Sequence, residues 1–578
     1  MRLATRAGAV WRLPLNVFPE GADPLSPQAA SRWIWGLLLL GAVARIVRYA
    51  LRFPLWCDEA YLSVNLLDRG CLDLMGPLEY HQVCPLLFLW AQWAMTKLLG
   101  FSEYSLRLVS LVCGLASLAV FRRLAGRLFH GTTLVLAVGV FAVAYPGIRY
   151  SAEAKPYGSD LLVSLVLLTL AVEWLRAPRS CAWALALIAV TPVALGLSYP
   201  AVFIAGAVGV AVAFRLSRAS RVAGWLLWGL YSAVVVASFV TFLWLVGENQ
   251  SASALEPMRA WWREQFPPLG SPWKLPGWLL AAHTGDMLAH PFGGRNYGST
   301  LTFLLCTVAL IALARRRQGT LIVLCLAPLA LNFAAAAVHR YPYGGHVRIA
   351  MFLAPIVCLL AGLGLSLCLH RFVARRSRQP TPVHLAAAVL GLLAVGSMGR
   401  DVCTPFRSEI DRQMRDFSRA FWRDEAAHSE LVCLRSDLGR TFAPRTLAGD
   451  DSSMYVCNQR IYSPRHRRGE SPDLSRVSAA RRLCCVRFRS SRASYDAVAF
   501  EAWLRDMQRR YRLVAHRSLP FPCRSRQRLH YVHYVETYEF VPRGPDAGKG
   551  LAVAQRECNR LRAGDWLIFR AVSGRKMC

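Results

Sequence analysis

The stretch "WIWGLLLLGAVARIVRYALRFPLWCDEAYL", residues 33–62, combines an apolar run long enough to cross a membrane with two adjacent carboxylates, Asp58 and Glu59. Similar apolar runs recur as far as about Met398, and the charged residues between them form short clusters. The chain has 578 residues, of which 54% are hydrophobic, and a formal net charge of +33, a combination that is rare in soluble domains. The sequence therefore predicts an all-α polytopic membrane domain.

The basic excess does not indicate a nucleic-acid-binding protein. Many of the arginines lie in loops beside apolar runs, and the sequence has no zinc-finger spacing and no RNA-binding signature. Residues 1–32 lack the apolar core and the small-residue cleavage site of a signal peptide. We therefore expect a cytoplasmic N-terminal tail over 1–32, contact with membrane lipids and no nucleic-acid partner.

The apolar runs predict eleven transmembrane helices in a membrane domain that covers residues 33–399. With these spans, the arginine-rich loops all fall on one side, which the positive-inside rule makes cytoplasmic. The apolar segment 84–100 would invert this pattern, so we expect it to lie at the outer interface or to re-enter the membrane. The chain is thus predicted to be a multi-pass protein of the plasma (inner) membrane. The predicted spans are 33–51, 105–121, 132–146, 158–175, 181–198, 199–214, 222–246, 300–314, 319–338, 349–370 and 383–399.

This topology places five polar loops on the exoplasmic or periplasmic side. Because they share one side of the membrane, their side chains are expected to form one polar surface. The loops contain Asp58 with Glu59, the stretch 79–85, the stretch 149–160, the long loop 248–298 and the stretch 339–348.

The remainder of the chain has a different pattern. Apolar runs shorten to strand length at 430–436 and 530–543, with a helical pattern between them at 496–513, so residues 400–543 predict a soluble α/β domain. An odd number of spans makes this domain exoplasmic, where some of its cysteines could form disulfides of unknown connectivity. Residues 544–578 form a C-terminal tail for which the sequence predicts no structure.

Asp58 and Glu59 follow Trp56 at a membrane interface, where a carboxylate beside apolar surface is able to accept a proton from a hydroxyl group. This position indicates a general base. The alternative is structural, with Asp58 capping a helix that contains "EAYLSVNLL", residues 59–67. The two interpretations are compatible, and these residues alone do not choose between them.

Arginines in and beside the first spans are candidates for binding a phosphate. Arg45 and Arg48 lie in the outer half of the first span, where a guanidinium is costly unless it meets water or a partner. Because the guanidinium fork matches phosphate oxygens, these residues and Arg107 could line a phosphate pocket. Snorkelling towards the interface is the alternative.

The stretch "RYSAEAKPYGSD", residues 149–160, packs four charges between two apolar spans. Such a stretch is usually a solvated turn, but its tyrosines and its proline favour a shaped loop. Lys155 could neutralise a leaving phosphate, whereas Asp160 is most simply the N-cap of the next span. In "RYPYGGHVR", residues 340–348, backbone amides of the Gly-Gly pair could approach an anion, with a tight interhelical turn as the alternative.

A possible metal site lies in "AAHTGDMLAHPFGG", where His283, Asp286 and His290 would share one face of a helix. The glycine and proline in this stretch weaken a helix, and histidines are common at membrane interfaces. We therefore assign no metal site. The sequence also lacks a nucleotide-phosphate loop, a G-x-S-x-G elbow and a zinc-protease helix.

Four segments together resemble a known family. The segments are "RYALRFPLWCDEAYL" (48–62), "CPLLFLWAQWAMTKLLGFSEYSLRLVSLVCGL" (84–115), "YSAEAKPYGSD" (150–160) and "YPYGGHVRIAMFLAP" (341–355). Over about residues 33–370, the chain resembles the GT-C glycosyltransferases that use polyprenyl-phosphate sugars. The similarity is to the branch with the protein mannosyltransferases and the aminoarabinose transferases of lipid A.

The resemblance implies a lipid-linked sugar donor and inverting transfer to a hydroxyl of an unknown glycan, lipid or protein acceptor. Asp58 would deprotonate the acceptor, while Glu59 would orient Asp58 or help to hold a cation. Lys155 stands where relatives often carry an arginine, so it would bind the donor phosphate. The cofactor is unknown, and a divalent cation stays open. Further candidates for the donor phosphate are Arg348, His346, Arg45 and Arg107.

The first exoplasmic loop departs from the family pattern. Relatives often have a charged residue or histidine before Pro-Pro-Leu, whereas this chain has His81 displaced from a single proline. His81 is retained as an acceptor or loop residue, together with Glu153 and Tyr157. Two other classes compete with the enzyme: a transporter or flippase for an anionic lipid or sugar, and a receptor anchored by the spans.

Overall fold

The computed structural model of the chain divides into two compact units, Met1–Arg407 and Ser408–Cys578. The predicted tail 544–578 and residues 1–22 lie outside the described part of the chain. The structure describes residues 23–177, 180–218, 222–247, 250, 256, 258–291, 293–294, 297–376, 380–420, 431–436, 447–462, 483–490, 497–524 and 530–543.

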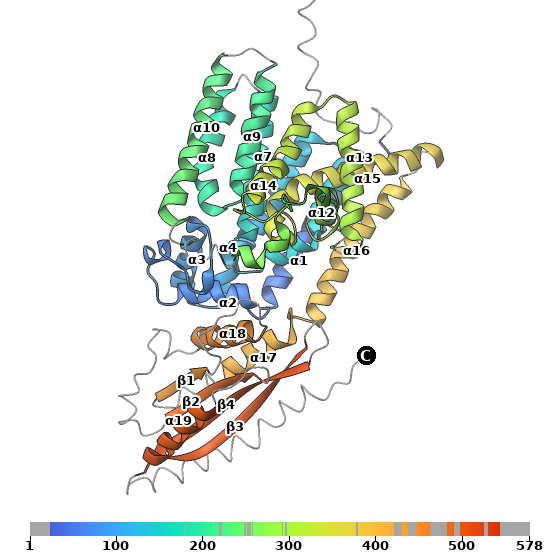
Figure 1. Cartoon of the computed structure of the whole chain (residues 1–578). Coiled ribbons are helices and arrows are strands. Elements are labelled where there is room, and N and C mark those ends of the chain that lie inside the picture. Colours follow the sequence, from blue (N-terminus) through green and yellow to red (C-terminus); the bar gives the residue numbers. More distant parts are fainter. Residues whose placement is uncertain are drawn as a thin grey trace, which may run out of the picture. The chain divides into compact units, whose positions relative to one another are not determined.

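The first unit consists of helices (Figure 1). Short 3-10 segments connect several of them, including Val347–Leu353, which leads into α15. The α-helices of this unit are α1 (Pro27–Ala50), α2 (Cys57–Ser63), α3 (Leu86–Leu99), α4 (Glu103–Leu128), α5 (Gly131–Val143), α6 (Tyr145–Tyr150), α7 (Tyr157–Arg176), α8 (Cys181–Leu197), α9 (Ala201–Leu216), α10 (Val222–Phe242), α12 (Leu275–Thr284), α13 (Gly298–Arg315), α14 (Gly319–Ala337), α15 (Ala354–Arg376) and α16 (Thr381–Cys403).

Each of the eleven predicted spans coincides with a helix. Eight helices within the described residues are long and apolar enough to cross a membrane by themselves. The other three predicted spans correspond to α5, α8 and α9, which have 13, 17 and 16 residues. The predicted interfacial segment 84–100 forms α3, whose 14 residues rise about 21 Å, less than the thickness of a bilayer core.

The first span begins earlier than its hydropathy predicts. α1 starts at Pro27 instead of Trp33, because the Ser26 hydroxyl accepts a hydrogen bond from the Ala29 amide and proline suits a first helical turn. The last span likewise extends to Cys403, beyond the predicted residue 399. Capping and helix propensity, which hydropathy does not measure, set both ends.

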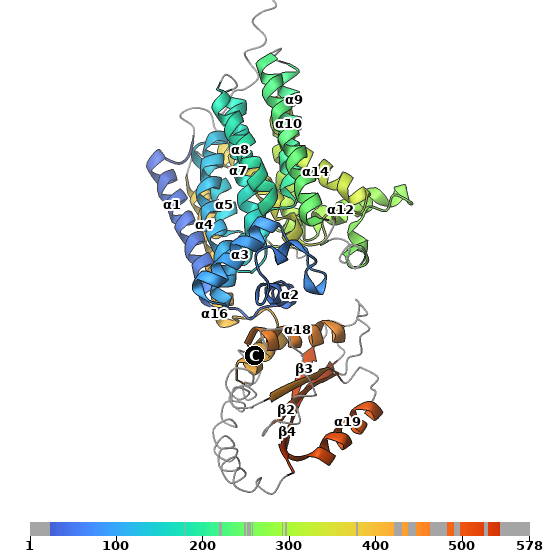
Figure 2. The same ribbon diagram turned by 90° about the vertical axis from the view of Figure 1, so that its left-hand side faces the viewer.

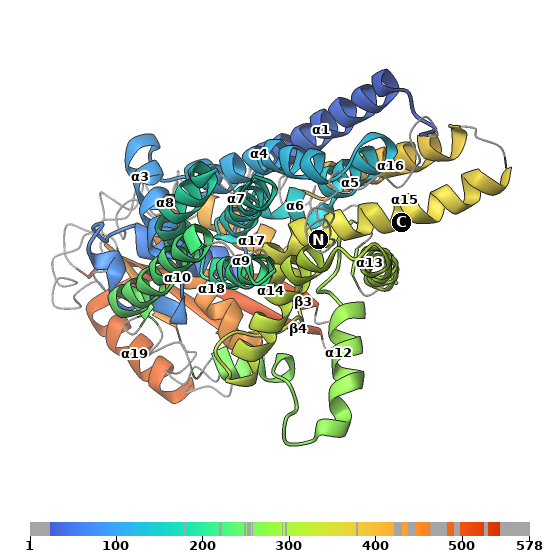
Figure 3. The ribbon, with the colours of Figure 1, turned by 90° about the horizontal axis from the view of Figure 1, so that it is seen from above.

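α7 is the central helix of the bundle. It packs against α4, α8 and α9, and the view along the bundle in Figure 3 shows these helices around it. Small residues bring α4 and the segment before α7 together: Gly158 faces the Ser110 carbonyl, and Gly114 faces the Ser151 side chain, with no room for a Cβ. This close approach fixes the segment 151–156 against α4.

One end of the bundle gathers several predicted polar loops. Figure 2 shows α2 and α3 together at that end, beside the end of α16. Because α2 follows α1 directly and the segment 151–156 is held by α4 and α7, the first and third polar loops are positioned by long helices. The candidate site is built here.

The second unit is an α/β domain. Its sheet has the order β1-β2-β4-β3, in which β1 and β2 are parallel and the other pairs are antiparallel. α18 lies between β1 and β2 in the chain, as a parallel pair requires a crossover. The elements are α17 (Glu409–Phe417), β1 (Leu431–Ser436), α18 (Leu447–Tyr462), β2 (Leu483–Ser490), α19 (Ala497–Arg510), β3 (Tyr511–Arg524) and β4 (His530–Pro542).

The predicted fold class, an all-α polytopic membrane domain followed by an α/β domain, is confirmed. The expected strands at 430–436 and 530–543 are β1 and β4, and the expected helix at 496–513 is α19. That helix ends at Arg510, and β3 begins at Tyr511. From Tyr511 onward exposed and less exposed side chains alternate, as in a strand. None of the described cysteine side chains forms a disulfide.

Candidate functional site

Asp58 is paired with an arginine of the fifth polar loop, which is distant in the sequence. Arg348 Nη1 donates to Asp58 Oδ2 at 2.6 Å, and the two side chains are 11% and 26% exposed. The alternative that Asp58 caps α2 is wrong: Trp56 is the N-cap, and Glu59 Oε2 accepts from the Trp56 amide at 3.4 Å. With capping done by its neighbour, the Asp58 carboxylate is left to face Arg348.

His346 orients the segment that carries Arg348. It is the N-cap of Val347–Leu353, and its Nδ1 accepts a hydrogen bond from the Arg348 amide at 3.2 Å. Burial and the positive charges of Arg348, Arg149 and Arg407 lower the pKa of His346 to about 3. The ring is therefore neutral at pH 7, and because Nδ1 accepts, the proton resides on Nε2.

Trp56 lies at the centre of the charged cluster. Its Nε1 donates to Glu153 Oε2 at 3.1 Å, and the guanidiniums of Arg348 and Arg407 lie 5.0 and 4.0 Å from the centre of its ring. Glu153 also accepts from Arg149 Nε at 2.7 Å. Burial alone would raise the pKa of Glu153, but the charge and hydrogen bond of Arg149, together with the charges of Arg48 and Arg407, outweigh burial and lower it. Glu153 is thus a charged, buried anchor for the indole ring.

Lys155 joins the third loop to the second loop. Its ammonium donates to Gln82 Oε1 at 2.6 Å, and the residue is only 6% exposed. Since Gln82 is neutral, this bond leaves the charge of Lys155 uncompensated. His81, the candidate from the same loop, lies in an exposed turn with a φ of 52°, whereas its neighbour Gln82 meets the cluster.

Glu59 and Arg107 pair with each other. Arg107 donates from Nε and Nη2 to the two oxygens of Glu59 at 2.8 and 2.7 Å, and from Nη1 to the Phe53 carbonyl at 2.7 Å. The Ala154 amide donates to Glu59 as well, at 2.7 Å. Both side chains are at most 2% exposed. The predictions that Glu59 orients Asp58 and that Arg107 lines a phosphate pocket are therefore replaced by a structural role, which ties α2, α4 and the segment 151–156 together.

Arg45 and Arg48 of α1 are also internal. Arg45 is completely buried, and its Nη1 donates to the carbonyls of Gly41 and Ala142 at 2.8 and 3.0 Å. Arg48 forms a salt bridge of 2.5 Å with Asp401 of α16. Neither residue snorkels, and the predicted phosphate role of Arg45 is not compatible with its burial.

The structure corrects the prediction for Asp160 and decides the alternatives for the Gly-Gly pair. Asp160 does not cap α7, because the N-cap is Pro156 and Asp160 lies inside the first turn. Gly344 and Gly345 have φ of 71° and 80°, and a Cβ at Gly345 would meet the Gln265 side chain at 2.2 Å. The Gly-Gly pair therefore makes the tight turn that was the alternative to an anion site.

The supposed metal face at 283–290 does not form. α12 ends at Thr284, so Asp286 and His290 lie beyond the helix, and His283 uses its ring nitrogens on the Leu279 carbonyl and the Tyr343 hydroxyl. In the described part of the chain, no three His, Cys, Asp or Glu side chains come together as metal ligands. Asp58 and Glu59 are also engaged by guanidiniums, so these two residues do not fit a divalent cation.

The expected convergence of the five loops is confirmed. Beyond the contacts above, the Arg348 guanidinium lies 5.5 Å from the ring centre of Trp262 in the fourth loop. The Cys84 amide of the second loop donates to Gln250 at 3.1 Å, and the Tyr343 amide of the fifth donates to the Gln265 carbonyl at 3.0 Å. The site is therefore assembled from all five loops.

Solved structures share this architecture. The chain superposes on ArnT from Cupriavidus metallidurans bound to undecaprenyl phosphate with a TM-score of 0.50 and 12% identity, covering 88% of this chain and 98% of ArnT. The chain therefore has the fold of ArnT. The apo structure of ArnT gives a TM-score of 0.48 and 13% identity over the same shares. No family model and no curated protein sequence matches the chain.

On this ArnT fold, the structure adds residues that sequence reasoning missed. Trp56 was read as an interface marker, but it contacts Glu153, Arg348 and Arg407. Arg407 follows the last span, in a stretch assigned to the soluble domain, and only its position over Trp56 identifies it. The role of Gln82 could not be predicted from a single sequence, because a neutral amide in a loop indicates no function until its partner, Lys155, is known.

Proposed function

We propose that the chain is an integral membrane glycosyltransferase that transfers a sugar from a polyprenyl-phosphate donor to an acceptor hydroxyl, with inversion at the anomeric carbon. The pairing of Asp58 with Arg348 carries this proposal, together with Lys155 and Arg407, two cations that form no ion pair with a carboxylate among the described residues. The fold of ArnT, which has been crystallised with undecaprenyl phosphate, supports the donor class. The multi-pass helices support an integral membrane location.

In this proposal Asp58 is the general base. Its Oδ2 is held by Arg348, while Oδ1 has a thiol contact of 4.0 Å to Cys57 and is left to accept a proton. As the acceptor oxygen attacks the anomeric carbon, its proton passes to Asp58 and the bond from that carbon to the phosphate oxygen breaks. The electron pair of the broken bond leaves with the polyprenyl phosphate. A hydroxyl group is too weak an acid to lose its proton first, so proton removal accompanies attack.

In this proposal Lys155 and Arg407 neutralise the negative charge of the leaving phosphate. Arg107, Arg149 and Arg348 each already face a carboxylate. Lys155 and Arg407 have no carboxylate partner among the residues that the structure describes. A phosphodiester carries one negative charge and the released monoester carries up to two, so uncompensated cations bind the product side more strongly than the donor.

The neutral residues have a positioning role. His346 presents the proton on Nε2 as a hydrogen-bond donor that carries no charge at pH 7. Tyr157, at the start of α7, packs its ring edge against Tyr150 with 5.0 Å between ring centres and would border the acceptor side together with Glu153. We place the site and the C-terminal domain on the exoplasmic side and the N-terminus in the cytoplasm.

The decisive experiment measures sugar transfer from radiolabelled polyprenyl-phosphate sugars in membranes that contain the wild type or the Asp58→Asn variant at matched amounts. Asparagine keeps a hydrogen bond to Arg348 but is a very weak base. We expect transfer to fall by about a factor of 10³. The matched control is Asp73→Asn, which changes a carboxylate that accepts from the Gly70 amide in the same loop. Normal turnover by folded Asp58→Asn would remove Asp58 as the base, and donor movement without transfer would favour a flippase.

A further inference from the structure

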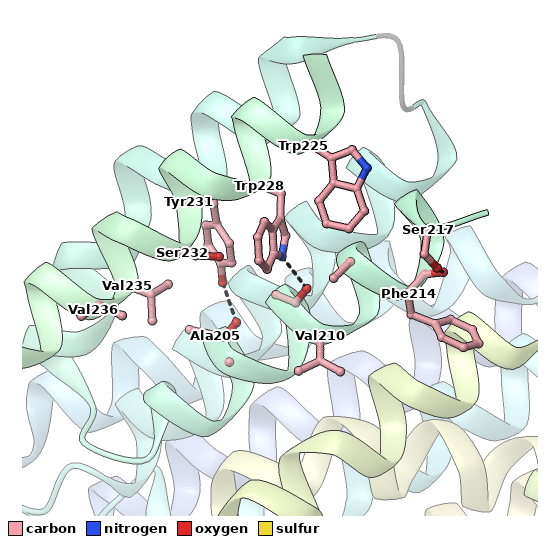
Figure 4. Close-up of a pocket in the computed structure, with 13 residues that line it drawn as sticks. Ala205, Val210, Phe214, Ser217, Trp225, Trp228, Tyr231, Ser232, Val235 and Val236 are labelled. Atoms are coloured by element: carbon pink, nitrogen blue, oxygen red, sulfur yellow. Dashed lines mark hydrogen bonds between the residues drawn. The ribbon is translucent and has the colours of Figure 1, made fainter. Parts of the chain in front are cut away.

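A groove between α9 and α10 lies apart from the charged cluster. Its volume is about 600 Å³, within the range of small-molecule sites. α9 contributes mainly small residues to the groove. α10 contributes larger side chains, and its tryptophans and tyrosine point towards α9 in Figure 4. The lining residues are Ala205, Gly206, Gly209, Val210, Ala213, Phe214, Ser217, Trp225, Trp228, Tyr231, Ser232, Val235 and Val236.

Hydrogen bonds join the two helices that border the groove. Trp228 Nε1 donates to the Gly209 carbonyl and the Tyr231 hydroxyl donates to the Ala205 carbonyl, both at 2.8 Å (Figure 4). These bonds use the polar atoms of both aromatic side chains and leave their rings as lining. An occupant of this part of the groove therefore meets almost only carbon, which favours a hydrocarbon chain.

The length of the groove matches one membrane leaflet. From Ala205 to Ser217 the axis of α9 rises about 18 Å, and half of a bilayer's hydrocarbon core is about 15 Å. A hydrocarbon chain that lay along the groove would extend from the middle of the membrane to the head-group region at the α9–α10 loop.

Arg218 follows the end of α9 at the loop end of the groove, on the side of Phe214 that packs against Gly319 of α14. The Arg218 guanidinium lies 4.1 Å from the ring centre of Phe214, which lines the groove. Arg218 has no carboxylate partner in the described part of the chain, and residues 215–221 contain three arginines and no acid. An anionic head group therefore complements this end.

The charged end is remote from the candidate active site. Tyr199, just before α9, donates to the Cys84 carbonyl of the second loop at 3.0 Å, so the start of α9 belongs to the site end. Arg218 follows the opposite end of α9, which is 16 residues or about 24 Å long. A donor whose phosphate sat at Arg218 would be out of reach of Asp58.

We propose that this groove binds an anionic phospholipid of the leaflet opposite the active site, with one acyl chain between α9 and α10 and the head-group phosphate at Arg218. The occupant is a structural lipid that fills the space between the two helices. The proposal does not depend on the glycosyltransferase activity, because it rests on the groove and on the charge at its end.

Native mass spectrometry of the purified full chain tests the proposal, with phosphatidylglycerol and phosphatidylcholine of identical acyl chains added separately. We expect phosphatidylglycerol to bind more tightly, and Arg218→Gln to weaken it about fivefold towards the phosphatidylcholine level. Arg122→Gln is the matched control, since Arg122 also lies over an aromatic ring, 4.5 Å from the centre of Trp35, but not at the groove. It is expected to leave phosphatidylglycerol binding unchanged.

Gly209→Leu tests the acyl-chain part. A Cβ at this position would lie 3.8 Å from the Tyr231 ring, an ordinary contact, so the added side chain would fill the groove without a clash at its first carbon. We expect it to abolish the tightly bound lipid. Equal binding of the two lipids, equal loss in Arg122→Gln, preferential capture of polyprenyl phosphate, or a dimer that excludes lipid would each overturn the proposal. If Gly209→Leu does not fold, the phosphatidylglycerol binding of Arg218→Gln alone tests the proposal.

Discussion

Arg348 donates a hydrogen bond of 2.6 Å to Asp58 across 290 residues of sequence. Through this contact, the segment that leads into α15 is joined to the first loop after α1. The guanidinium also lies near the indole rings of Trp56 and Trp262, at 5.0 and 5.5 Å from their centres. Planarity therefore matters at this position as well as charge.

Arg348→Lys tests that planarity. Lysine keeps the positive charge but cannot lie flat against the two rings, so Asp58 loses its orientation. We expect kcat to fall about tenfold or more with a smaller change in KM, because misplacement of a catalytic group costs rate. Steady-state kinetics with saturating donor measures the split. An unchanged kcat would show that charge alone suffices at this position.

Arg407→Gln tests the uncompensated cation over Trp56. Arg407 is exposed, and Glu153, on which its charge acts, keeps its ion pair with Arg149, so the loss of Arg407 is expected to change the melting temperature only slightly. We expect inhibition by the product polyprenyl phosphate to weaken about tenfold, as a charge-assisted hydrogen bond is lost. Arg407→Lys should recover part of the effect. Unaltered product inhibition would exclude Arg407 from the phosphate site.

Lys155→Gln should also weaken inhibition by the product polyprenyl phosphate. We expect the KM for the donor to rise more than the KM for the acceptor. The ammonium has a neutral partner, Gln82, so its charge is available to a phosphate. Titrating donor and acceptor separately measures the two constants. A rise confined to the KM for the acceptor would assign Lys155 to the acceptor site instead of the donor phosphate.

Glu59→Gln and Arg107→Met test a structural role. Each variant leaves one member of a buried ion pair without its counter-charge, which costs about 3–5 kcal/mol. We expect a large fall in the melting temperature for either single variant and a smaller fall for the double variant, because the double variant leaves no unpaired charge. Loss of activity at an unchanged melting temperature would instead assign these residues to catalysis.

The pH dependence of stability reports on His346. Its pKa is about 3 in the folded protein and near its usual value of about 6.5 in the unfolded chain. Below pH 6.5 the unfolded chain therefore binds a proton that the folded protein does not, so stability falls as the pH falls from 6.5 towards 3. We expect the melting temperature of His346→Gln to fall less between pH 7 and pH 5 than that of the wild type. Parallel curves would show that the ring is not buried beside cations.

Hydropathy predicted the membrane unit because each long helix must bury its apolar side chains in lipid or protein, and that requirement is visible residue by residue. Apolar runs of strand length identified β1 and β4 in the same way. Helix ends were less predictable: α1 begins at Pro27 because of a single hydroxyl on Ser26, which adds nothing to a hydropathy average.

The candidate site was predictable only in part. Polar loops that share one side of a membrane were expected to meet, and Asp58, Glu153, Lys155 and Arg348 do lie in loops that contact one another. Which charge pairs with which was not predictable, since neighbours in sequence take different partners. Glu59, next to Asp58, is bound to Arg107 instead of the site.

The salt bridge between Arg48 and Asp401 has a consequence for biosynthesis. The two residues are 353 positions apart, on the first and last helices of the membrane unit. At about 5–20 residues per second, a ribosome delivers the carboxylate roughly 20 to 70 s after the guanidinium. During that interval Arg48 of α1 lacks the counter-charge of Asp401. Its guanidinium must therefore contact water, lipid head groups or the insertion machinery. A chain truncated before α16 would retain this charge without its partner Asp401.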